Sequence, residues 1–336
     1  MTDRVLVTGA TGFLGSEIVR VLLERGYRVR GTTTDLSGWG PAHPLAGSPC
    51  ALERLEMVEM HLLDAGSIDS AVRGCRHVIH AASPFRIQVD DPAEQLVRPA
   101  VEGTRALLRA ARREGAERVV LTSSMVALAG ASVGRPLTED DWNTTSSLGR
   151  DPYAYSKTMA ERAAWAMVDS QGGTPSLVAI NPSAIIGPSL MDRLNQAHRI
   201  FTVLARAPVV LDIEFQVVDV RDVAAAHVAA LESPRAAGRY PLSAGGIHLR
   251  ALGEMVDEAM GSRRTRIPLD NSVGTKLVRA LASLVPGGNS DYLRRMVGHR
   301  HPVDASRARR DLGFEPRPIA DSVRDTVASL ESWGRL

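Results

Sequence analysis

The sequence predicts an α/β fold: a doubly wound parallel sheet covered by helices, with a smaller, mainly helical C-terminal lobe. Two observations predict it. Short apolar runs alternate with longer segments of helical periodicity, which is the pattern of βαβ units. A glycine-rich turn also follows the first apolar run and opens the first helix. With 336 residues, the chain is long enough for one large domain or two closely joined ones.

The apolar runs are short enough to be buried parallel strands, which need no polar face because helices cover both sides. They lie at residues 4–8, 28–34, 55–60, 77–82, 118–123 and 177–182. The segments between them predict helices at 13–26, 67–74, 92–115 and from Tyr153 to about Ser170.

The glycine-rich turn, GATGFLG at residues 9–15, has the spacing G-x-x-G-x-x-G directly between a strand and a helix. Glycine permits the tight turn and the close approach of a pyrophosphate, and the helix N-terminus supplies free N–H donors. This context predicts a Rossmann-type NAD(P) site. Its expected turn residues are Gly9, Thr11, Gly12, Phe13, Leu14 and Gly15.

The end of the second strand bears on which dinucleotide binds. An acid there holds the ribose hydroxyls of NAD, whereas basic and hydroxyl groups suit the 2′-phosphate of NADP. Asp35 lies one or two residues late for the first role, while Arg30, Thr33 and Thr34 could serve the second. We therefore expect a modest preference for NADP(H) over NAD(H).

A tyrosine and a lysine four residues apart, Tyr153 and Lys157, would share one face of a helix. A nearby ammonium group lowers the pKa of a phenol and makes it a usable proton donor and acceptor. Ser123 and Ser124 end the fifth strand nearby. Because successive strand residues point to opposite faces, only one of them can face the cleft.

These segments together resemble the extended short-chain dehydrogenase/reductases of the NAD-dependent epimerase/dehydratase superfamily, and within them the dihydroflavonol reductase, cinnamoyl-CoA reductase and aldehyde reductase branch. The resemblance covers nearly the whole chain. It rests on GATGFLG, HAASP (80–84), residues 91–111, TSSMVAL (122–128), YAYSK (153–157), INPSAIIGP (180–188), residues 217–231 and the tail 303–327.

The resemblance implies an NAD(P)-dependent oxidoreductase that reduces an aldehyde or ketone to an alcohol, or the reverse, by hydride transfer. It places the family's catalytic group on Ser124, Tyr153 and Lys157. Tyr153 would protonate the carbonyl oxygen, Ser124 would hold that oxygen, and Lys157 would bind the nicotinamide ribose. Further cofactor contacts are expected at His61, Leu62, Ala81, Ala82, Ser83, Thr122, Pro182, Ser183 and Ile185.

The chain also departs from the branch. Thr34 replaces the arginine that grips the 2′-phosphate, and His61 replaces an aspartate beside the adenine. Ala129 and the segment 150–153 replace the signatures of the two plant activities, so neither activity transfers. An apolar substrate is expected from a wall formed by Phe85, Met125, Trp142, Ile186 and Phe201.

Two other functions stay open. A nucleotide-sugar epimerase or dehydratase would use the same tyrosine and lysine with tightly held NAD. Its sugar diphosphate would need basic groups in the C-terminal lobe, for which Arg193, Arg199, Arg206 and Arg239 are candidates. A non-catalytic NAD(P)-sensing protein is the second alternative, but a sensor would need neither Tyr153 nor Lys157.

The domain division is expected at residue 183. Residues 1–183 would form the NAD(P)-binding domain with the catalytic residues, and residues 184–336 the substrate-binding lobe. There the strand and helix alternation weakens, with strand-like runs at 215–220 and 238–242. We expect the segment at about 215–232 to return to the main domain.

The composition is ordinary for a soluble protein, with 40 Lys and Arg against 38 Asp and Glu. We expect a small-molecule substrate, a cytoplasmic location and no nucleic-acid, membrane or metal partner; two cysteines, Cys50 and Cys75, make neither a disulfide framework nor a metal cluster. The resemblance implies a homodimer. Its surface could be formed by Leu96, Val97, Ala100, Ala160 and Trp165, which could equally face the sheet.

Overall fold

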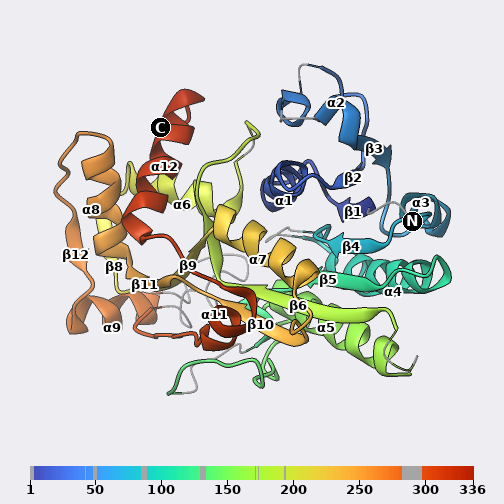
Figure 1. Ribbon diagram of the computed structural model, residues 1–336. Coiled ribbons are helices and arrows are strands. Elements are labelled where there is room, and N and C mark those ends of the chain that lie inside the picture. The colour runs from blue at the N-terminus through green and yellow to red at the C-terminus, as the bar shows by residue number, and fades with distance from the viewer. Residues whose placement is uncertain are drawn as a thin grey trace.

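A computed structural model shows two parts that share one continuous fold: a large sheet covered by helices and a smaller lobe beside it (Figure 1). The structure describes residues 4–41, 43–47, 51–84, 89–128, 134–170, 172, 174–192, 194–281 and 297–336.

The large sheet has 7 strands among the described residues, in the order β10-β6-β5-β4-β1-β2-β3, and every neighbouring pair is parallel. The order reverses between β1 and β4, so their carboxyl ends diverge there and leave room for a ligand. The strands are β1 (Arg4–Thr8), β2 (Arg28–Thr33), β3 (Leu55–Glu59), β4 (His77–His80), β5 (Arg118–Thr122), β6 (Ser176–Pro182) and β10 (Gly238–Leu242).

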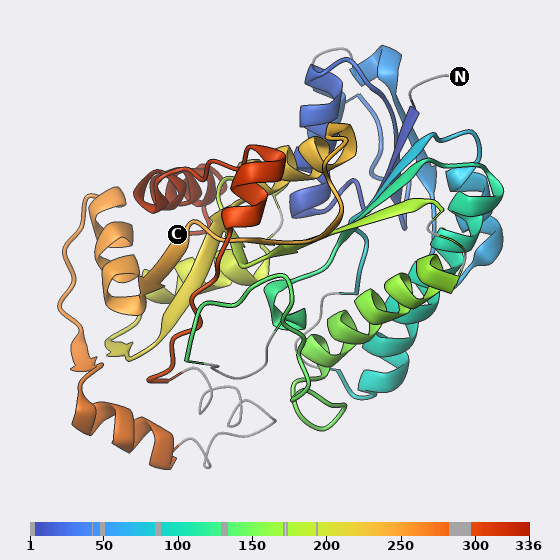
Figure 2. The same cartoon turned by 60° about the horizontal axis from the view of Figure 1, so that its bottom comes forward.

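Helices cover both faces of this sheet, which confirms the predicted fold class. On one face α1 (Phe13–Glu24) and α7 (Val220–Glu232) share an apolar core with the strands. On the other, α3 (Ala65–Val72), α4 (Arg98–Arg113) and α5 (Pro152–Ser170) form a second core. Figure 2 shows α4 and α5 running side by side along that face. The remaining short elements are η1 (Pro44–Gly47), α2 (Ala51–Arg54), η2 (Ala93–Val97), η3 (Met125–Ala127) and α11 (Ser306–Leu312).

The packing of α4 and α5 bears on the expected homodimer. Leu96, Ala100 and Ala160 are all buried inside the monomer, with exposures of 0%, 4% and 7%. Val97 and Trp165 are half-buried. Leu96, Ala100 and Ala160 therefore pack within the chain, which for these three is the second of the two alternatives set out from the sequence. The homodimer itself stays a prediction.

The C-terminal lobe has its own apolar core and more strand than expected. A 3-stranded sheet joins β7 (Ala184–Ile186), β9 (Glu214–Asp219) and β11 (Gly245–His248), and β8 (Val209–Leu211) pairs with β12 (Ile267–Leu269). In the part that the structure describes, the lobe also contains the helices α6 (Gln196–Leu204), α8 (Leu249–Ala259), α9 (Ser272–Leu281) and α12 (Ile319–Ser332). Figure 1 shows these elements grouped on one side of the molecule.

The chain crosses between the two parts more than once. After β9 in the small sheet, α7 returns to pack in the core of the main domain, and β10 pairs with β6 as the last strand of the large sheet. The division of the chain into two domains at residue 183 stays a prediction, and β10 lies beyond it. Within the described residues, no helix is long and apolar enough to cross a membrane.

Candidate active site

The glycine turn is built by backbone contacts that leave no space for side chains. Gly9 has a φ of +68°, and a Cβ there would lie 3.1 Å from the Cα of Ala82 on the neighbouring connection. A Cβ on Gly15 would lie only 2.1 Å from the carbonyl oxygen of Gly9. These two glycines therefore let α1 begin directly against the turn, close to the end of β4.

This turn fits a dinucleotide pyrophosphate. Gly12 is the N-cap of α1 and offers no side-chain cap, so the helix N-terminus keeps backbone N–H groups that no side chain of the cap satisfies. Such groups attract a phosphate. Thr11, Phe13 and Leu14 lie on the same turn and first helical residues, and the Thr11 hydroxyl reaches Thr33 on β2 at 3.4 Å.

Arg30 does not serve the role expected from the sequence. It lies within β2, and its guanidinium turns to the carboxyl end of α3, where it donates to the carbonyl oxygens of Ala71 at 3.0 Å and Arg73 at 2.8 Å. It also pairs with Glu56 at 3.0 Å. A side chain held by these partners is not free for a 2′-phosphate, so this prediction is wrong.

The end of β2 carries one acidic side chain among several hydroxyl side chains. Thr33 donates to the carbonyl oxygen of Asp35 at 3.1 Å. The Asp35 carboxylate accepts from the backbone and hydroxyl of Ser37, both at 2.8 Å, and these bonds lower the pKa of Asp35. Thr34 is exposed beside them. An exposed carboxylate that stays charged suits ribose hydroxyls, whereas the threonines suit a phosphate, so the choice of dinucleotide stays a prediction.

The expected adenine and ribose contacts lie around the next strand ends. His61 is half exposed, with its Nε2 bonded to Glu59 at 3.0 Å, and Leu62 packs against Gly103 of α4. Ala81, Ala82 and Ser83 follow β4, and the last two line a pocket with Lys157. Their roles as cofactor contacts stay predictions.

The two serines at the end of β5 turn to different partners. The buried Ser123 hydroxyl donates to the carboxylate of Glu161 at 2.5 Å. Ser124 is half-buried, begins η3, accepts from the Val126 N–H at 3.3 Å and shares a hydrogen bond with the Tyr153 hydroxyl. The hydroxyls of Ser124 and Tyr153 are therefore joined by a hydrogen bond, whereas the hydroxyl of Ser123 is bonded to Glu161.

The pKa of Tyr153 differs from the expectation. Burial raises it above its ordinary range and the charge of Asp151 adds to this, while only the bond with Ser124 lowers it. The prediction that Lys157 would lower this pKa is wrong, because desolvation of the phenolate dominates. The phenol is therefore held in its protonated form, ready to donate.

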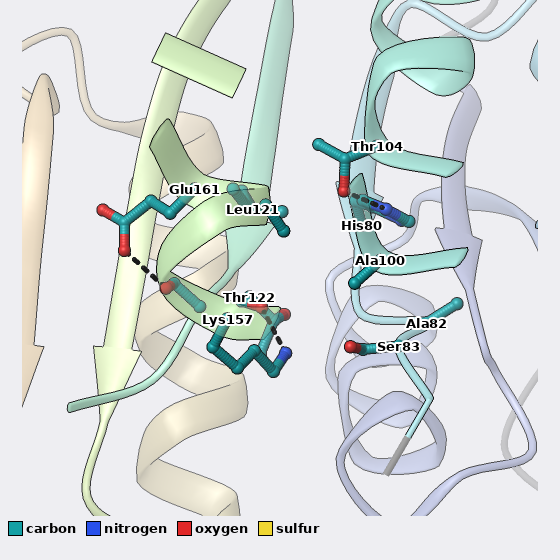
Figure 3. Close-up of a pocket in the computed structure, with 11 residues that line it drawn as sticks. His80, Ala82, Ser83, Ala100, Thr104, Leu121, Thr122, Lys157 and Glu161 are labelled. Atoms are coloured by element: carbon teal, nitrogen blue, oxygen red, sulfur yellow. Dashed lines mark hydrogen bonds between the residues drawn. The ribbon is translucent and has the colours of Figure 1, made fainter. Parts of the chain in front are cut away.

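Lys157 lies one turn after Tyr153 on α5 and is 8% exposed. Its ammonium donates to the carbonyl oxygen of Thr122 at 3.2 Å, and across the pocket lie Ser83, Ala82 and His80 (Figure 3). Burial lowers the pKa of Lys157 from 10.5 to about 8, although the charge of Glu161 acts in the opposite direction. Lys157 is thus charged at neutral pH and loses its charge as the pH rises through about 8.

Two buried histidines support these strand ends. His80 bonds Thr8 at 2.8 Å and Thr104 at 3.3 Å, and burial, with the charge of Lys157, lowers its pKa to about 3. His227 on α7 bonds Thr122 at 2.8 Å, and burial lowers its pKa to about 4. Both rings are therefore neutral, and they fix the threonines beside the glycine turn and Lys157 rather than act as bases.

The end of β6 presents buried polar atoms without protein partners in the described part of the chain. These are the Ser183 hydroxyl and the Asn181 side-chain oxygen. Pro182 is buried at the same strand end, and Ile185 packs on the main core. A buried hydroxyl without a partner costs free energy unless a ligand supplies one. This segment therefore fits the amide end of a nicotinamide.

The expected apolar substrate wall is only partly supported. Ile186 and Phe201 are 3% and 1% exposed inside the core of the C-terminal lobe, so their assignment to a substrate surface is wrong. The Trp142 ring lies 3.8 Å from the guanidinium carbon of Arg239 and serves as a packing surface. Met125 is half-buried directly after Ser124. Phe85 lies outside the described residues.

Three buried residues at this site were not predicted for the role that they have here: Glu161, Asn181 and Arg239, of which Arg239 was a candidate only for a sugar diphosphate. Glu161 is 0% exposed, Asn181 is 0% exposed and Arg239 is 6% exposed. One signal was present for Glu161, which lies four residues after Lys157 and therefore one turn further along the same helical face.

The chain is similar to known proteins over most of its length. The model of the NAD dependent epimerase/dehydratase family matches residues 5–242. A cinnamoyl-CoA reductase of Medicago truncatula is 40% identical over 97% of this chain and 95% of its own length. A tetraketide alpha-pyrone reductase of Arabidopsis thaliana is 37% identical over 99% of this chain and 97% of its own.

Among solved structures, Gre2 from Candida albicans in complex with NADPH superposes with a TM-score of 0.81. It is 28% identical, and the match covers 98% of this chain and 99% of Gre2. The vestitone reductase of alfalfa gives a TM-score of 0.74 at 26% identity, with 99% of both chains covered.

Fold and sequence relatives therefore place the chain in one class. It belongs to the NAD dependent epimerase/dehydratase family and, within it, to the extended short-chain reductases, as predicted. It is an NAD(P)-dependent oxidoreductase that acts on carbonyl groups.

The glycine contacts give a first test. Gly15→Ala should lower the free energy of unfolding by roughly 1–3 kcal/mol, because the added methyl meets backbone that cannot move aside. It should also weaken NADPH and NADH binding by at least about tenfold, since α1 shifts from the turn. Calorimetry measures the affinities of the parent and the variant for NADPH and for NADH. Gly47→Ala, where a Cβ meets nothing within 4 Å, is the matched control. Unchanged binding by Gly15→Ala would refute the phosphate turn.

Arg30 gives a second test. Arg30→Gln should lower the free energy of unfolding by about 1–3 kcal/mol, because it leaves buried carbonyl oxygens without donors. The ratio of NADPH to NADH affinities should stay as in the parent protein. Urea unfolding and nucleotide binding measure the two effects, with the exposed Arg28→Gln on the same strand as control. A selective loss of NADPH affinity would restore the phosphate role.

Proposed function

We propose that the protein reduces an aldehyde or ketone to an alcohol with Tyr153 as proton donor, Ser124 as the group that holds the carbonyl oxygen, and Lys157 as the cation beside the nucleotide ribose. The observation that carries this proposal is the joined pair of hydroxyls on Ser124 and Tyr153, one helical turn from the buried ammonium of Lys157.

The fit of a nicotinamide nucleotide rests on features of this chain. The uncapped start of α1 and the glycines that exclude side chains would hold the pyrophosphate, and the unpartnered Ser183 hydroxyl would meet the amide. When bound, the reduced nicotinamide supplies the hydride.

The protein's own groups perform the proton chemistry. As the carbonyl oxygen gains negative charge, the two hydroxyls of Ser124 and Tyr153 donate to it, and Tyr153 then transfers its proton. The raised pKa of Tyr153 keeps that proton available at neutral pH. The ammonium of Lys157, held by the Thr122 carbonyl, would bind the ribose of the nucleotide that delivers the hydride.

An apolar substrate and a preference for NADPH are further parts of the proposal. The relatives named cinnamoyl-CoA reductase and tetraketide alpha-pyrone reductase support an apolar substrate, and Met125 next to Ser124 offers such a compound an apolar contact. The NADPH complex of Candida albicans Gre2 supports NADPH. Arg30 gives no support, so the preference now rests on Thr33 and Thr34 at the end of β2. A cytoplasmic location stays a prediction.

The nucleotide-sugar alternative loses part of its basis. Arg239, one of its four candidate arginines, is buried and donates to Glu161 at 2.6 Å, so it cannot reach a sugar diphosphate. Arg199 and Arg206 are exposed, and Arg193 lies outside the described residues. The sensor alternative leaves the joined hydroxyls of Ser124 and Tyr153 without a purpose.

Replacement of the proton donor tests the proposal. Tyr153→Phe should lower kcat for carbonyl reduction by about 10²–10⁴-fold, which is the usual contribution of a general acid, with nucleotide affinity unchanged. Oxidation of NADPH and of NADH is followed with a panel of aliphatic, aromatic and cyclic aldehydes and ketones. Wild-type turnover retained in the variant would contradict the role of Tyr153, and no turnover by the parent with any carbonyl would move the search to nucleotide sugars.

The pH dependence follows from Lys157. Its pKa is about 8, whereas that of Tyr153 is raised above its ordinary range, so Lys157 loses its proton first as pH rises. Reduction needs the ammonium, and kcat/KM for the reduced nucleotide should therefore be constant at lower pH and fall as pH rises through about 8. We call this fall the alkaline limb of the pH profile. A kcat/KM that stays constant to pH values well above about 8 would contradict the role of the Lys157 charge.

A further inference from the structure

The most enclosed ionised group of the site is Glu161, a residue without a role in the chemistry proposed above. It lies on α5 one turn after Lys157 and is 0% exposed. A buried carboxylate is stable only with hydrogen-bonding partners. The Glu161 carboxylate accepts from Ser123 Oγ at 2.5 Å, Arg239 Nε at 2.6 Å, Asn181 Nδ2 at 2.9 Å and Trp165 Nε1 at 3.3 Å.

These donors connect Glu161 to the segment that carries Ser124. Asn181 on β6 donates not only to Glu161 but also to the carbonyl oxygen of Ser124, at 3.3 Å. Arg239 on β10 donates to the carbonyl oxygen of Ala127, at 3.4 Å. The start and the end of η3 are thus tied to one carboxylate through two buried side chains.

Arg239 also holds the chain that leads to Tyr153. Its guanidinium donates to the carbonyl oxygen of Glu139 at 2.8 Å and to that of Asp141, and it stacks on the ring of Trp142 at 3.8 Å. The ion pair of Arg239 and Glu161 therefore fastens this loop to α5. The segment that carries Ser124 and the loop that leads to Tyr153 are therefore both bonded to the ion pair of Glu161 and Arg239.

Glu161 also acts on the charge of Lys157. Both residues lie on α5 and line one pocket, although the Glu161 carboxylate and the Lys157 ammonium point in different directions (Figure 3). The other described groups around Lys157 carry no charge at neutral pH: His80 from β4, Ala100 and Thr104 from α4, and Tyr153 on its own helix. Burial lowers the pKa of Lys157, and the charge of Glu161 raises it.

We propose that Glu161 is a positioning residue of the active site: with Arg239 it fixes the segments that present Ser124 and Tyr153, and it balances the charge of Lys157 from one helical turn away. This inference rests on the proposed function. It adds a residue that touches neither substrate nor nucleotide and still sets the pH range in which the site works.

The test is Glu161→Gln, which keeps the shape of the side chain and removes its charge. The alkaline limb of kcat/KM for the reduced nucleotide should move down by about one pH unit, a tenfold change in the ionisation ratio of Lys157. The value of kcat below the limb should also fall, because the segments that carry Ser124 and Tyr153 lose the ion pair with Arg239. The affinity for NADP⁺ and NAD⁺, measured by calorimetry over the same pH range, should show the same displacement.

The binding measurement separates the two proposals, because it needs no carbonyl substrate. If the parent protein binds nucleotide but reduces no carbonyl, the proposed function fails while the displacement in Glu161→Gln still tests this inference. A folded Glu161→Gln protein with the parent's limb would overturn the inference.

The matched control is a second buried ion pair in the C-terminal lobe, Asp257 with Arg266 at 2.6 Å, whose side chains are 7% and 6% exposed. Asp257→Asn should lower the melting temperature and leave the alkaline limb in place. The same displacement in this control would overturn the inference, because it would follow from lost stability alone.

Glu161→Asp covers the case in which Glu161→Gln does not fold. Aspartate keeps the charge and shortens the reach to Ser123, Asn181 and Arg239. It should lower kcat and leave the limb at the parent's pH. A limb displaced downward despite the retained charge would refute the proposal.

Discussion

The carboxylate of Glu161 is the constraint on which the geometry of the site depends. Around it converge β5 through Ser123, β6 through Asn181 and β10 through Arg239, so the last strand of the sheet is tied to the helix that carries Tyr153 and Lys157. A buried charge fixes its donors closely, because the alternative is an unpaired ion in a medium of low dielectric constant. The return of the chain to form β10 is what brings Arg239 to this position.

The fold could be predicted from the sequence because its signals are local. Most of the first six strands contain a short apolar run, although β2 holds only one apolar side chain, and the glycine spacing marks the start of α1. Less was visible in the C-terminal lobe, where β7, β9 and β11 pair through contacts distant in sequence. Their sequences are too short and too mixed for periodicity to separate strand from loop.

The site was predictable where spacing has a chemical reason, as with Tyr153 and Lys157. The prediction failed for residues whose role depends on neighbours that are distant in the sequence. From the sequence Arg30 looks like a phosphate ligand, because its partners, the carbonyl oxygens of Ala71 and Arg73, lie 41 and 43 residues later in the chain. Phe201 near a substrate motif looks the same in sequence as Phe201 in a core. Burial also reversed the expected pKa shift of Tyr153, because desolvation depends on what packs around the phenol.

The measurement that tests the account most directly is the fate of the hydride. The protein is incubated with NADPH or NADH that carries deuterium at both hydrogens of the transferring carbon, together with the best aldehyde or ketone of the panel, and the products are analysed by mass spectrometry. The account predicts deuterium on the carbinol carbon of the product and accumulation of oxidised nucleotide. Product free of deuterium, or conversion of a nucleotide sugar with no net oxidation of the nucleotide, would contradict it.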